Sequence, residues 1–512
     1  MQRTRRAAAA VAVAAAVGLV IAGCTSAGGT GDGAGGGGAT VDELKIGTFL
    51  DVTSWDPANA DIGFDGPYLS AVYDPLVALD KDSKPVPALA TSWEWSPDLR
   101  TLTMKLRTDA TFTDGQKFDA AAAVKNLRHL KAGVRSNQAY ANVADFAAVD
   151  ASTLRITMKK RDDALLYQMG LGRSWMASPA AVGNDSLNAE PVGSGPYAYD
   201  KAQSTKASQY VFTRKAEHWD GGTYPFRTVR MFPITDQTAS MNAMLSGQLN
   251  VNFANAADIP RARENGWNVA STRASWVGIQ FVDRTGTQLK PLGDVRVRQA
   301  ICYAFDGAAI LKAVGNDAGV ATNQLFPEGR GIYDAALNSR YATSLDKAKQ
   351  LLTEAGYPNG FEVTMPMSPI FQGWQPAATQ TFEKLGIRVK WRDMSMPDYM
   401  KNAPTYPMFL AVIAMSSNDM ATVNDHITSV QWYNPRPSVD AFPEIRSLAA
   451  QVEAATGEEQ AALIRRLNAA LVEQAFQNVW YQADNTYFSV KGVTVTPITG
   501  MMFPTLRFIQ RG

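Results

Sequence analysis

The chain has 512 residues, of which 46% are hydrophobic, and its 49 basic and 48 acidic side chains nearly cancel. This balance leaves no excess of positive charge for nucleic acid or a lipid surface, so we expect neither partner for the body of the protein. Its two cysteines, Cys24 and Cys302, cannot provide a disulfide framework. Core packing must therefore stabilise the fold, and Cys302 is predicted to be a small buried side chain.

The first 23 residues resemble the signal peptide of a bacterial lipoprotein. Three Arg residues precede an apolar run over residues 7–22, and Gly23-Cys24 follows. A cationic start, an apolar core of about 7 to 15 residues and small residues before the cleavage site are the parts of a Sec signal. The resemblance implies cleavage before Cys24 and lipidation of its thiol, which would anchor the protein at the outer face of the cytoplasmic membrane. An uncleaved span is the alternative, but it would need about 20 apolar residues, and this run is shorter and contains Gly18.

Residues 24–40 are predicted to be a tether. From residue 25 onward they consist mostly of Gly, Ala, Ser and Thr, and Asp32 is the only charged residue among them. Such a segment cannot bury enough apolar surface to fold. As a flexible coil it would reach about 20 to 24 Å, from about 5 to 6 Å times the square root of its length.

Strands and helices are mixed along the rest of the chain. Period-two alternation of apolar and polar residues predicts strands over Leu44–Phe49, Thr101–Leu106 and Thr153–Met158. Helical patterns with capping signals predict helices over Phe118–Leu130, where Asp119 is the N-cap, over Leu345–Ala355, which follows Ser344, and over Glu459–Phe476. A mixed chain of this length is expected to form two or three lobes.

A series of short motifs follows in a fixed order. It begins with Pro87–Glu94, Thr101–Arg107 and Phe112–Gly115, and it continues with Pro191–Tyr197, Ala243–Asn250, Asp294–Asp306, Ala348–Tyr357, Gly386–Val389 and Trp480–Tyr481. The set resembles the family 5 extracytoplasmic solute-binding proteins, which are the oligopeptide-, dipeptide- and nickel-binding components of ABC importers. The resemblance extends from about Leu44 to the C-terminus. Within the most specific motif, Arg296 and Arg298 are interpreted as structural residues that form ion pairs.

The resemblance implies an α/β fold of the periplasmic-binding-protein type (type II, cluster C). Two lobes joined by a hinge would enclose an interlobe ligand cleft, with an extra subdomain inserted in the N-terminal lobe, and the hinge would close around the ligand. The expected organisation is a signal peptide (1–23), a tether (24–40), lobe I (41–70, 191–284 and 482–512), an inserted subdomain (71–190) and lobe II (285–481).

The same resemblance implies a function in transport. The protein is expected to be a monomeric, membrane-tethered substrate-binding protein that captures a solute and delivers it to an ABC permease driven by ATPase subunits. A peptide is the favoured solute, and an oligosaccharide or another uncharged solute is the alternative. A secreted hydrolase or a wall-associated sensing lipoprotein is the alternative of another class. No cofactor is expected.

A cleft that closes over a solute needs flat apolar walls and a few polar groups for orientation. Aromatic chemistry and the resemblance together suggest six such side chains, which are Trp55, Trp276, Gln280, Trp374, Trp432 and Tyr481. Packing in a hydrophobic core is the alternative role for each aromatic residue.

Residues 414–419 form the other candidate ligand segment. In peptide-binding members the corresponding place resembles Gly-Trp-x-x-Asp, and its Asp pairs with the amino terminus of a peptide. Here Met415 matches the Trp and Asn418 matches the Asp, Ser416 lies between them, and a shift by one residue would place Asp419 in that role. A neutral amide would bind a zwitterionic peptide less well than a carboxylate, which favours an uncharged solute such as a sugar.

Metal and catalytic sites find little support in the sequence. The three His residues are far apart and no paired Cys motif occurs, so no metal site is predicted. His426 is interpreted as a surface residue, and a place in the cleft near Asp425 is the alternative. A nickel complex carried as a solute stays an open alternative. Ser344 and Lys347 have the Ser-x-x-Lys spacing of penicillin-recognising enzymes, but the companion motifs are missing, and Ser344 is better explained as a helix N-cap. We therefore expect no enzyme activity and no catalytic residue.

Overall fold

The computed structural model describes residues 41–328 and 331–512, which belong to one compact unit that begins at Thr40. The predicted signal peptide, the tether and Cys24 lie outside the described residues. Within the described ranges, no helix is both long enough and apolar enough to cross a membrane. Cys302 is buried, with 3% of its surface exposed, as predicted.

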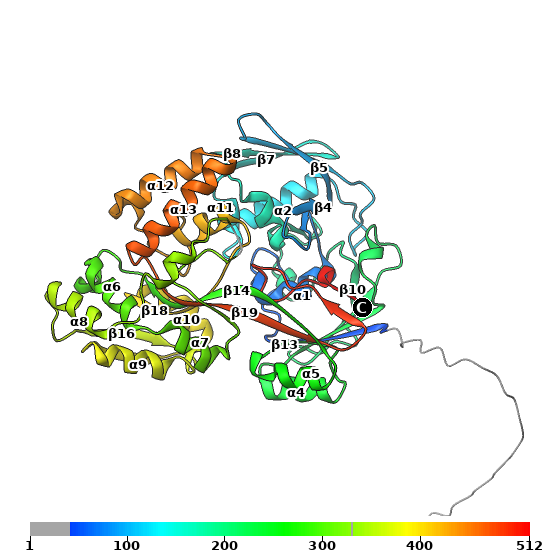
Figure 1. The fold of residues 1–512 in the computed structure, drawn as a ribbon. Coiled ribbons are helices and arrows are strands. Elements are labelled where there is room, and N and C mark those ends of the chain that lie inside the picture. The colour runs from blue at the N-terminus through cyan, green and yellow to red at the C-terminus, as the bar shows by residue number, and fades with distance from the viewer. Residues whose placement is uncertain (1–40, 329–330) are drawn as a thin grey trace, which may run out of the picture. The chain divides into compact units, whose positions relative to one another are not determined.

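The central element of the described chain is a mixed sheet of nine strands (Figure 1). Eight of them follow the order β10 (Tyr197–Tyr199), β11 (Tyr210–Arg214), β12 (Thr228–Pro233), β1 (Glu43–Thr48), β13 (Val251–Ala254), β19 (Asn478–Ser489), β14 (Asn268–Phe281) and β18 (Met408–Ala414). The ninth, β15 (Gly319–Ala321), also pairs with β19. β1 is parallel to β12 and β13, and it matches the first predicted strand.

Two long strands, β14 and β19, connect the two ends of this sheet. They pair antiparallel from Asn268 opposite Ser489 to Ile279 opposite Asn478, with two irregularities in the register. Gly278 lies at the second irregularity, where a Cβ would stand 1.9 Å from the carbonyl oxygen of Asn478, so only glycine allows the strands to approach. β18 pairs with the second half of β14, whereas β13 pairs with the far end of β19.

A second sheet has four strands and its own hydrophobic core. Its order is β5 (Ala90–Trp95), β6 (Thr101–Leu106), β8 (Thr153–Met158) and β7 (Val143–Asp150). The buried faces of β6 and β8 pack with α2 (Ala120–Ala132) through residues such as Leu102, Leu127 and Ile156. The predicted strands over 101–106 and 153–158 are confirmed. Asp119 caps α2 as predicted, because its Oδ1 accepts a hydrogen bond from the amide of Ala122 at 2.8 Å.

The remaining strands form two-stranded pairs. These pairs are β2 (Asp74–Pro75) with β9 (Trp175–Met176), β3 (Val77–Leu79) with β4 (Pro85–Pro87), β16 (Glu362–Met367) with β17 (Arg388–Asp393), and β20 (Val493–Val495) with β21 (Ile509–Arg511). The β16–β17 pair is parallel, and the other three are antiparallel.

Helices pack around these sheets (Figure 1). Besides α2 they are α1 (Ile62–Val72), α3 (Leu165–Gln168), α4 (Gln237–Leu245), α5 (Ile259–Glu264), α6 (Val295–Ala304), α7 (Gly307–Gly315), α8 (Leu345–Glu354), α9 (Gln375–Lys384), α10 (Met396–Asn402), α11 (Asp419–Val423), α12 (Pro443–Ala454) and α13 (Gly457–Glu473). Ser344 caps α8 as predicted, since its Oγ accepts from the amide of Lys347 at 3.2 Å. The last predicted helix corresponds to α13, which ends three residues earlier than expected.

The two arginines of the most specific motif have different roles. Arg296 pairs with Asp294 at 2.6 Å, as predicted. The prediction for Arg298 is wrong, because this buried guanidinium donates to backbone carbonyls, including Leu292 at 2.7 Å and Gln474 at 3.0 Å. Gln474 follows the last residue of α13, where backbone carbonyls lack helical partners and the helix dipole is negative. Arg298 therefore caps the C-terminal end of α13.

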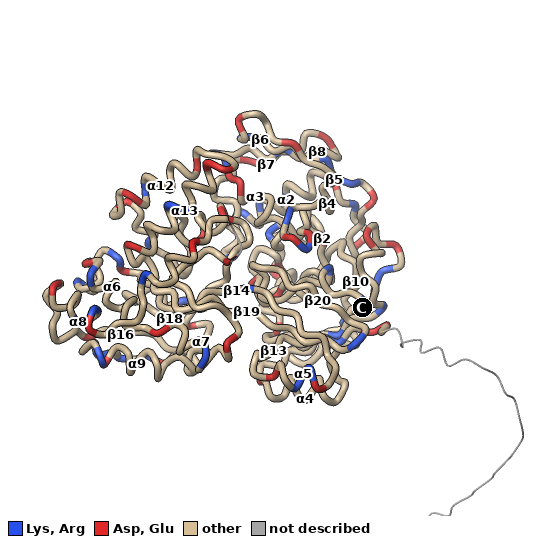
Figure 2. Tube along the Cα trace, in the orientation of Figure 1, with Lys and Arg blue, Asp and Glu red and all other residues tan. Residues whose placement is uncertain are grey.

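Acidic and basic residues are interspersed along the described chain (Figure 2). Many of them form exposed pairs, such as Lys390 with Glu362 at 3.1 Å and Lys201 with Glu190 at 2.6 Å. This arrangement agrees with the near-neutral charge of the sequence.

Candidate ligand site

Two segments far apart in the sequence meet through polar side chains. The first, residues 162–173, contains α3 and a π-helical turn over Met169–Arg173, and the second, residues 415–434, contains α11 and a π-helical turn over Asn424–Thr428. The phenol oxygen of Tyr167 accepts from the amide of Ser417 at 3.1 Å, and Gln168 Nε2 donates to Asp425 Oδ2 at 2.9 Å. We call this contact region the junction.

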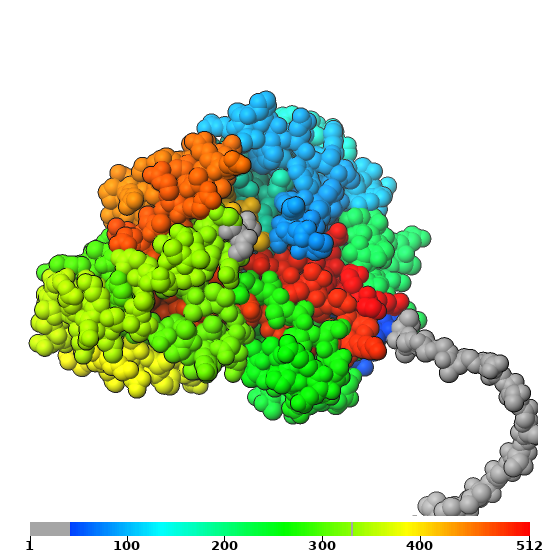
Figure 3. All heavy atoms as spheres, viewed as in Figure 1, coloured from blue at the N-terminus to red at the C-terminus, as the bar shows by residue number. Residues whose placement is uncertain are grey.

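A second group of contacts lies beside the junction. Lys160 pairs with Glu453 at 2.7 Å, Arg161 Nη1 donates to the carbonyl of Ala455 at 3.0 Å, and Gln460 Nε2 donates to Asp163 at 3.3 Å. These contacts join the end of β8 to α12 and α13, and Figure 3 shows the α12–α13 region (orange) against the region of the four-stranded sheet (blue). Both groups contain hydrogen bonds and ion pairs, and buried apolar side chains of the two junction segments, including Leu171 and Met415, also belong to one hydrophobic core.

Asp425 is the acidic group at the centre of the junction. Its Oδ2 accepts from Gln168 at 2.9 Å and its Oδ1 accepts from Gln431 Nε2 at 3.0 Å. Burial raises the pKa of Asp425 to about 7, and the nearby carboxylate of Asp162 acts in the same direction, whereas the Gln168 hydrogen bond and the Arg173 guanidinium oppose the rise. Asp425 is therefore close to half protonated at neutral pH.

Arg173 is the basic group at the junction. It follows Gly172, whose φ of 106° is available to glycine at low cost, and a Cβ on Gly172 would stand 2.7 Å from the Trp175 ring. The Arg173 Nη1 atom is buried and has no hydrogen-bond partner among the described residues. Burial lowers the pKa of Arg173, while the carboxylates of Asp61 and Asp425 act in the opposite direction.

The structure brings the candidate segment 415–419 to the junction. Met415 and Ser416 are buried, and Ser416 Oγ accepts from the amide of Asn418 at 3.1 Å. Asn418 is the N-cap of α11, since its Oδ1 accepts from the amide of Ala421 at 2.9 Å. Asp419 is the first residue of α11.

Of the other candidates, Trp276, Gln280 and Trp432 belong to the sheet region beneath the junction. Trp276 is fully buried, and its indole N–H donates to Nδ1 of His426 at 3.4 Å. Gln280 lies four residues along β14 on the same face, and neither atom of its buried amide has a hydrogen-bond partner among the described residues. Trp432 stacks on Phe409 of β18, with a centroid separation of 6.1 Å and an interplanar angle of 20°.

The last three candidates are found elsewhere. Trp374 donates from Nε1 to the hydroxyl of Tyr481 at 2.9 Å, and Tyr481 lies on β19. Trp55 lies in a separate aromatic core with Tyr68, Tyr199, Tyr210 and Phe212, and its exposed fraction is 3%. The structure thus gathers seven of the ten candidates in or beneath the junction and leaves Trp55, Trp374 and Tyr481 outside that group.

The interpretation of His426 as a surface residue is wrong. Only 3% of its surface is exposed, and burial lowers its pKa to about 4, so the ring is neutral and can accept from Trp276. In the described part of the chain, no group of three or more His, Cys, Asp or Glu side chains is placed to hold a metal ion.

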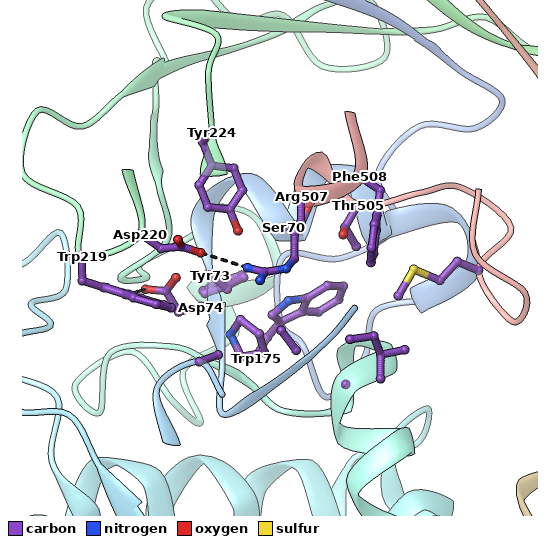
Figure 4. Close-up of a pocket in the computed structure, with 16 residues that line it drawn as sticks. Ser70, Tyr73, Asp74, Trp175, Trp219, Asp220, Tyr224, Thr505, Arg507 and Phe508 are labelled. Atoms are coloured by element: carbon purple, nitrogen blue, oxygen red, sulfur yellow. Dashed lines mark hydrogen bonds and ion pairs between the residues drawn. The ribbon is translucent and has the colours of Figure 1, made fainter. Parts of the chain in front are cut away.

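A small cavity lies next to α1, and Gly170 of the first junction segment is among the residues that line it (Figure 4). Its volume of about 30 Å³ has room for about two water molecules. Its charged groups are already paired, because Arg507 contacts Asp220 at 2.9 Å and Asp74 accepts from the Trp219 indole at 3.2 Å and lies 3.1 Å from His218. We interpret this cavity as a structural joint, because it is too small for a peptide or sugar.

Several residues of the junction were not found from the sequence, and they include Tyr167, Gln168, Arg173 and Asp425. A signal for one of them was present, since Arg173 is the only charged residue in the stretch 164–182. A lone charge in such a stretch usually needs a specific partner once the chain folds.

The family model described as bacterial extracellular solute-binding proteins, family 5 Middle, matches residues 84–435. The chain belongs to this family. Heme-binding protein A of Haemophilus influenzae is 28% identical over 387 residues, which are 68% of this chain and 69% of that protein. Glutathione-binding protein GsiB of Escherichia coli K12 is 30% identical over 323 residues, which are 61% of each chain.

Solved structures share the fold of this family member. The periplasmic binding protein AgaA from A. tumefacien R10, in complex with agropinic acid, has a TM-score of 0.79 and 23% identity and covers 92% of this chain and 99% of its own. DppA from Helicobacter pylori, in complex with the peptide STSA, has a TM-score of 0.80 and 20% identity, and it covers 92% of this chain and 98% of its own. The chain therefore has the type II periplasmic-binding-protein fold, as predicted.

Proposed function

We propose that this family member is the lipid-anchored, monomeric solute-binding component of an ABC importer, which closes on a small solute at the junction and delivers it to the permease. The observation that carries the proposal is the set of polar contacts at the junction, where Tyr167 and Gln168 bind the second segment beside shared apolar packing. Such polar contacts exchange with water when they open, and partly polar interfaces between domains of one chain commonly allow relative motion. Hinge closure around a ligand is the established motion of such binding proteins.

The lobe boundaries predicted from the sequence remain part of this proposal. The four-stranded sheet lies within 71–190, as do all buried residues of its core except Ala58, which supports an inserted subdomain. The first segment of the junction belongs to this subdomain and the second to lobe II (285–481). Lobe I (41–70, 191–284 and 482–512) would connect to lobe II through β14, which pairs with β18 of lobe II, and through β19, which begins in lobe II and continues into lobe I.

The solute is proposed to be a peptide or a peptide-like acid. Related proteins are named for binding glutathione, agropinic acid and a peptide, and each of these molecules carries a carboxylate. The argument for a sugar relied on the neutral amide of Asn418. Because Asn418 Oδ1 already caps α11, this oxygen serves the helix, and the case for an uncharged solute is weaker.

A hydrolase is the less supported alternative. The family consists of solute-binding proteins, and Ser344 of the Ser-x-x-Lys pattern has an ordinary role as the N-cap of α8. Mass spectrometry of a solute recovered after binding would identify any chemical change. We expect the solute to be recovered intact.

Small-angle scattering of the mature protein, with and without solute, tests the proposed closure. The panel contains tri-alanine, glutathione and maltotriose, and calorimetry on the same samples reports which of them bind. We expect a smaller radius of gyration with each solute that binds. Binding with an unchanged scattering profile would contradict closure.

The proposed anchor has a separate test. Replacing Cys24 by Ala removes the thiol that lipidation requires. When expressing cells are extracted with detergent and the phases are separated, the full-length variant should no longer partition into the detergent phase. Unchanged partition would argue against lipidation at Cys24.

A further inference from the structure

We propose that Arg173 binds an anionic group of the solute at the junction. This proposal deepens the proposed function and rests on it, because it assigns the solute class that the closing site accepts. The ligand chemistry is a carboxylate or a phosphate, both of which match the planar donors of a guanidinium.

The position of Arg173 is the first observation. The π-helical turn and the left-handed Gly172 place it at the junction between two segments that the chain brings together only through tertiary contacts. Its backbone is also fixed, since the Arg173 carbonyl accepts a hydrogen bond from the hydroxyl of Tyr140. A charged side chain on a backbone held in this way is suited to recognition, because little backbone entropy is lost on binding.

The unpartnered Nη1 atom is the second observation. A buried cationic donor without an acceptor costs free energy, and proteins compensate such groups with an opposite charge. Nη1 has no hydrogen-bond partner in the described part of the chain. A solute anion would supply the missing acceptor.

The two carboxylates near Arg173 have other donors. Asp61 pairs with Arg135 at 3.3 Å and accepts from the amide of Gly63 at 3.0 Å. Asp425 accepts from Gln168 and Gln431 with one oxygen each. Both lower the local potential around Arg173, but neither occupies Nη1.

Anion binding at Arg173 would also act on Asp425. The titratable and polar groups that face Asp425 are Gln168, Gln431, Arg173, Asp162, Tyr167 and Tyr433. A second negative charge beside Asp425 would offset the stabilising effect of Arg173 on its ionised form, so the carboxylate would take up a proton as the solute binds. Affinity for the anionic solute should therefore rise as the pH falls toward 6.

Matched pairs of solutes test the recognition. Isothermal titration calorimetry compares tri-alanine with its C-terminal amide and glutathione with its diethyl ester, on the mature wild-type protein and its variants. For the wild-type protein we expect the acid of a pair to bind about 10- to 100-fold more tightly than its neutral partner, which is the range for a charge-assisted hydrogen bond. In Arg173→Gln this preference should fall below about threefold, whereas Arg173→Lys should keep part of it.

Arg135→Gln is the matched control. It removes one positive charge near the same carboxylates, but Arg135 is half-exposed and already paired with Asp61. We expect the acid preference to remain. If both variants lose the preference for the acid equally, the preference results from the overall electrostatic potential and not from Arg173. An unchanged preference in folded Arg173→Gln would also overturn the role of Arg173.

Proton uptake provides a readout that a merely structural role would not change. Titrations at pH 7 in two buffers with different ionisation enthalpies give the number of protons bound with the solute. We expect net uptake in the wild-type protein and its loss in Asp425→Asn. Zero uptake in the wild-type protein would contradict the coupling.

The outcomes separate this proposal from the proposed function. Binding without compaction contradicts closure, whereas compaction by acid and neutral solutes alike contradicts only the role of Arg173. If no member of the panel binds, mass spectrometry of the solute released by denaturing the protein from its native cells decides the matter. A released solute that carries an anionic group supports the proposal. A released solute without an anionic group overturns it, and so does the absence of any released solute.

Discussion

Replacing Asp425 by Asn should remove a pH-dependent cost from the folded protein. The pKa of about 7 in the folded chain lies above the unperturbed value of about 3.9, because burial disfavours the ionised carboxylate. Between these two values the unfolded chain has released the proton and the folded chain has kept it. Stability is therefore greatest at low pH and falls as the pH rises toward 7, and above 7 the full cost is present.

The difference between the two pKa values sets the size of the change in the free energy of unfolding. Between pH 5 and pH 7 the loss is about 1.4 kcal/mol for each tenfold change in proton concentration, or about 3 kcal/mol. Asp425 retains some exposure to solvent, so we expect about 2 kcal/mol. His426 acts in the opposite direction, since its pKa of about 4 makes the fold gain stability as the pH rises from about 4 to 6.5. The pH dependence of stability in the wild-type protein therefore contains the contributions of both Asp425 and His426.

The difference between variant and wild type isolates Asp425. Thermal melting at pH 5 and pH 8 should show that the stability of Asp425→Asn relative to wild type rises by about 2 kcal/mol from pH 5 to pH 8. Asp145→Asn is a matched control, because its side chain is 64% exposed and lies on β7. Parallel profiles for wild type and Asp425→Asn would refute the assignment of a raised pKa to this carboxylate.

Three further measurements test local features of the fold. Gly172→Ala should lower the free energy of unfolding by about 1 to 3 kcal/mol through its backbone conformation, and further through the clash with the Trp175 ring. Gly183 also has a positive φ, 89°, but open space surrounds it, so Gly183→Ala should show only the backbone contribution in the same melting assay. Lys160→Gln should change stability by less than about 1 kcal/mol, and the change should vanish in high salt, because Lys160 and Glu453 form an exposed pair. Burial raises the pKa of Cys302 and covers its thiol, so a thiol reagent should react with it only after unfolding, and fast reaction in the native state would count against the packing.

Regular elements with local signals could be predicted from the sequence. β6 and β8 follow from strict alternation, and α2 and α8 follow from capping residues that bond to the amide three positions ahead. Each of these signals acts over a few residues, so tertiary context does not change it. Arg298 shows where local reasoning fails, because its carbonyl partners near Gln474 become neighbours only in the folded chain.

The candidate site was predicted in part for the same reason. Residues 415–419 could be located because a family motif marks them, although Asn418 caps a helix that the sequence analysis did not predict. The partners from residues 162–173 carry no motif and meet this segment only through long-range contacts, so Tyr167 and Gln168 were not found. Trp55 was a reasonable candidate from chemistry alone, yet its ring fills an aromatic core.

The charged groups of the junction give it a property that a transport protein needs. The apolar side chains that the two segments share favour closure, since burial of apolar surface is favourable by itself. Closure also buries Arg173 without an acceptor for Nη1 and raises the pKa of Asp425, and both of these effects oppose closure. A solute that supplies an acceptor to Arg173 removes the first cost, and a proton removes the second. The closed form would then be more stable when it is loaded, and departure of the solute anion from Arg173 would favour reopening.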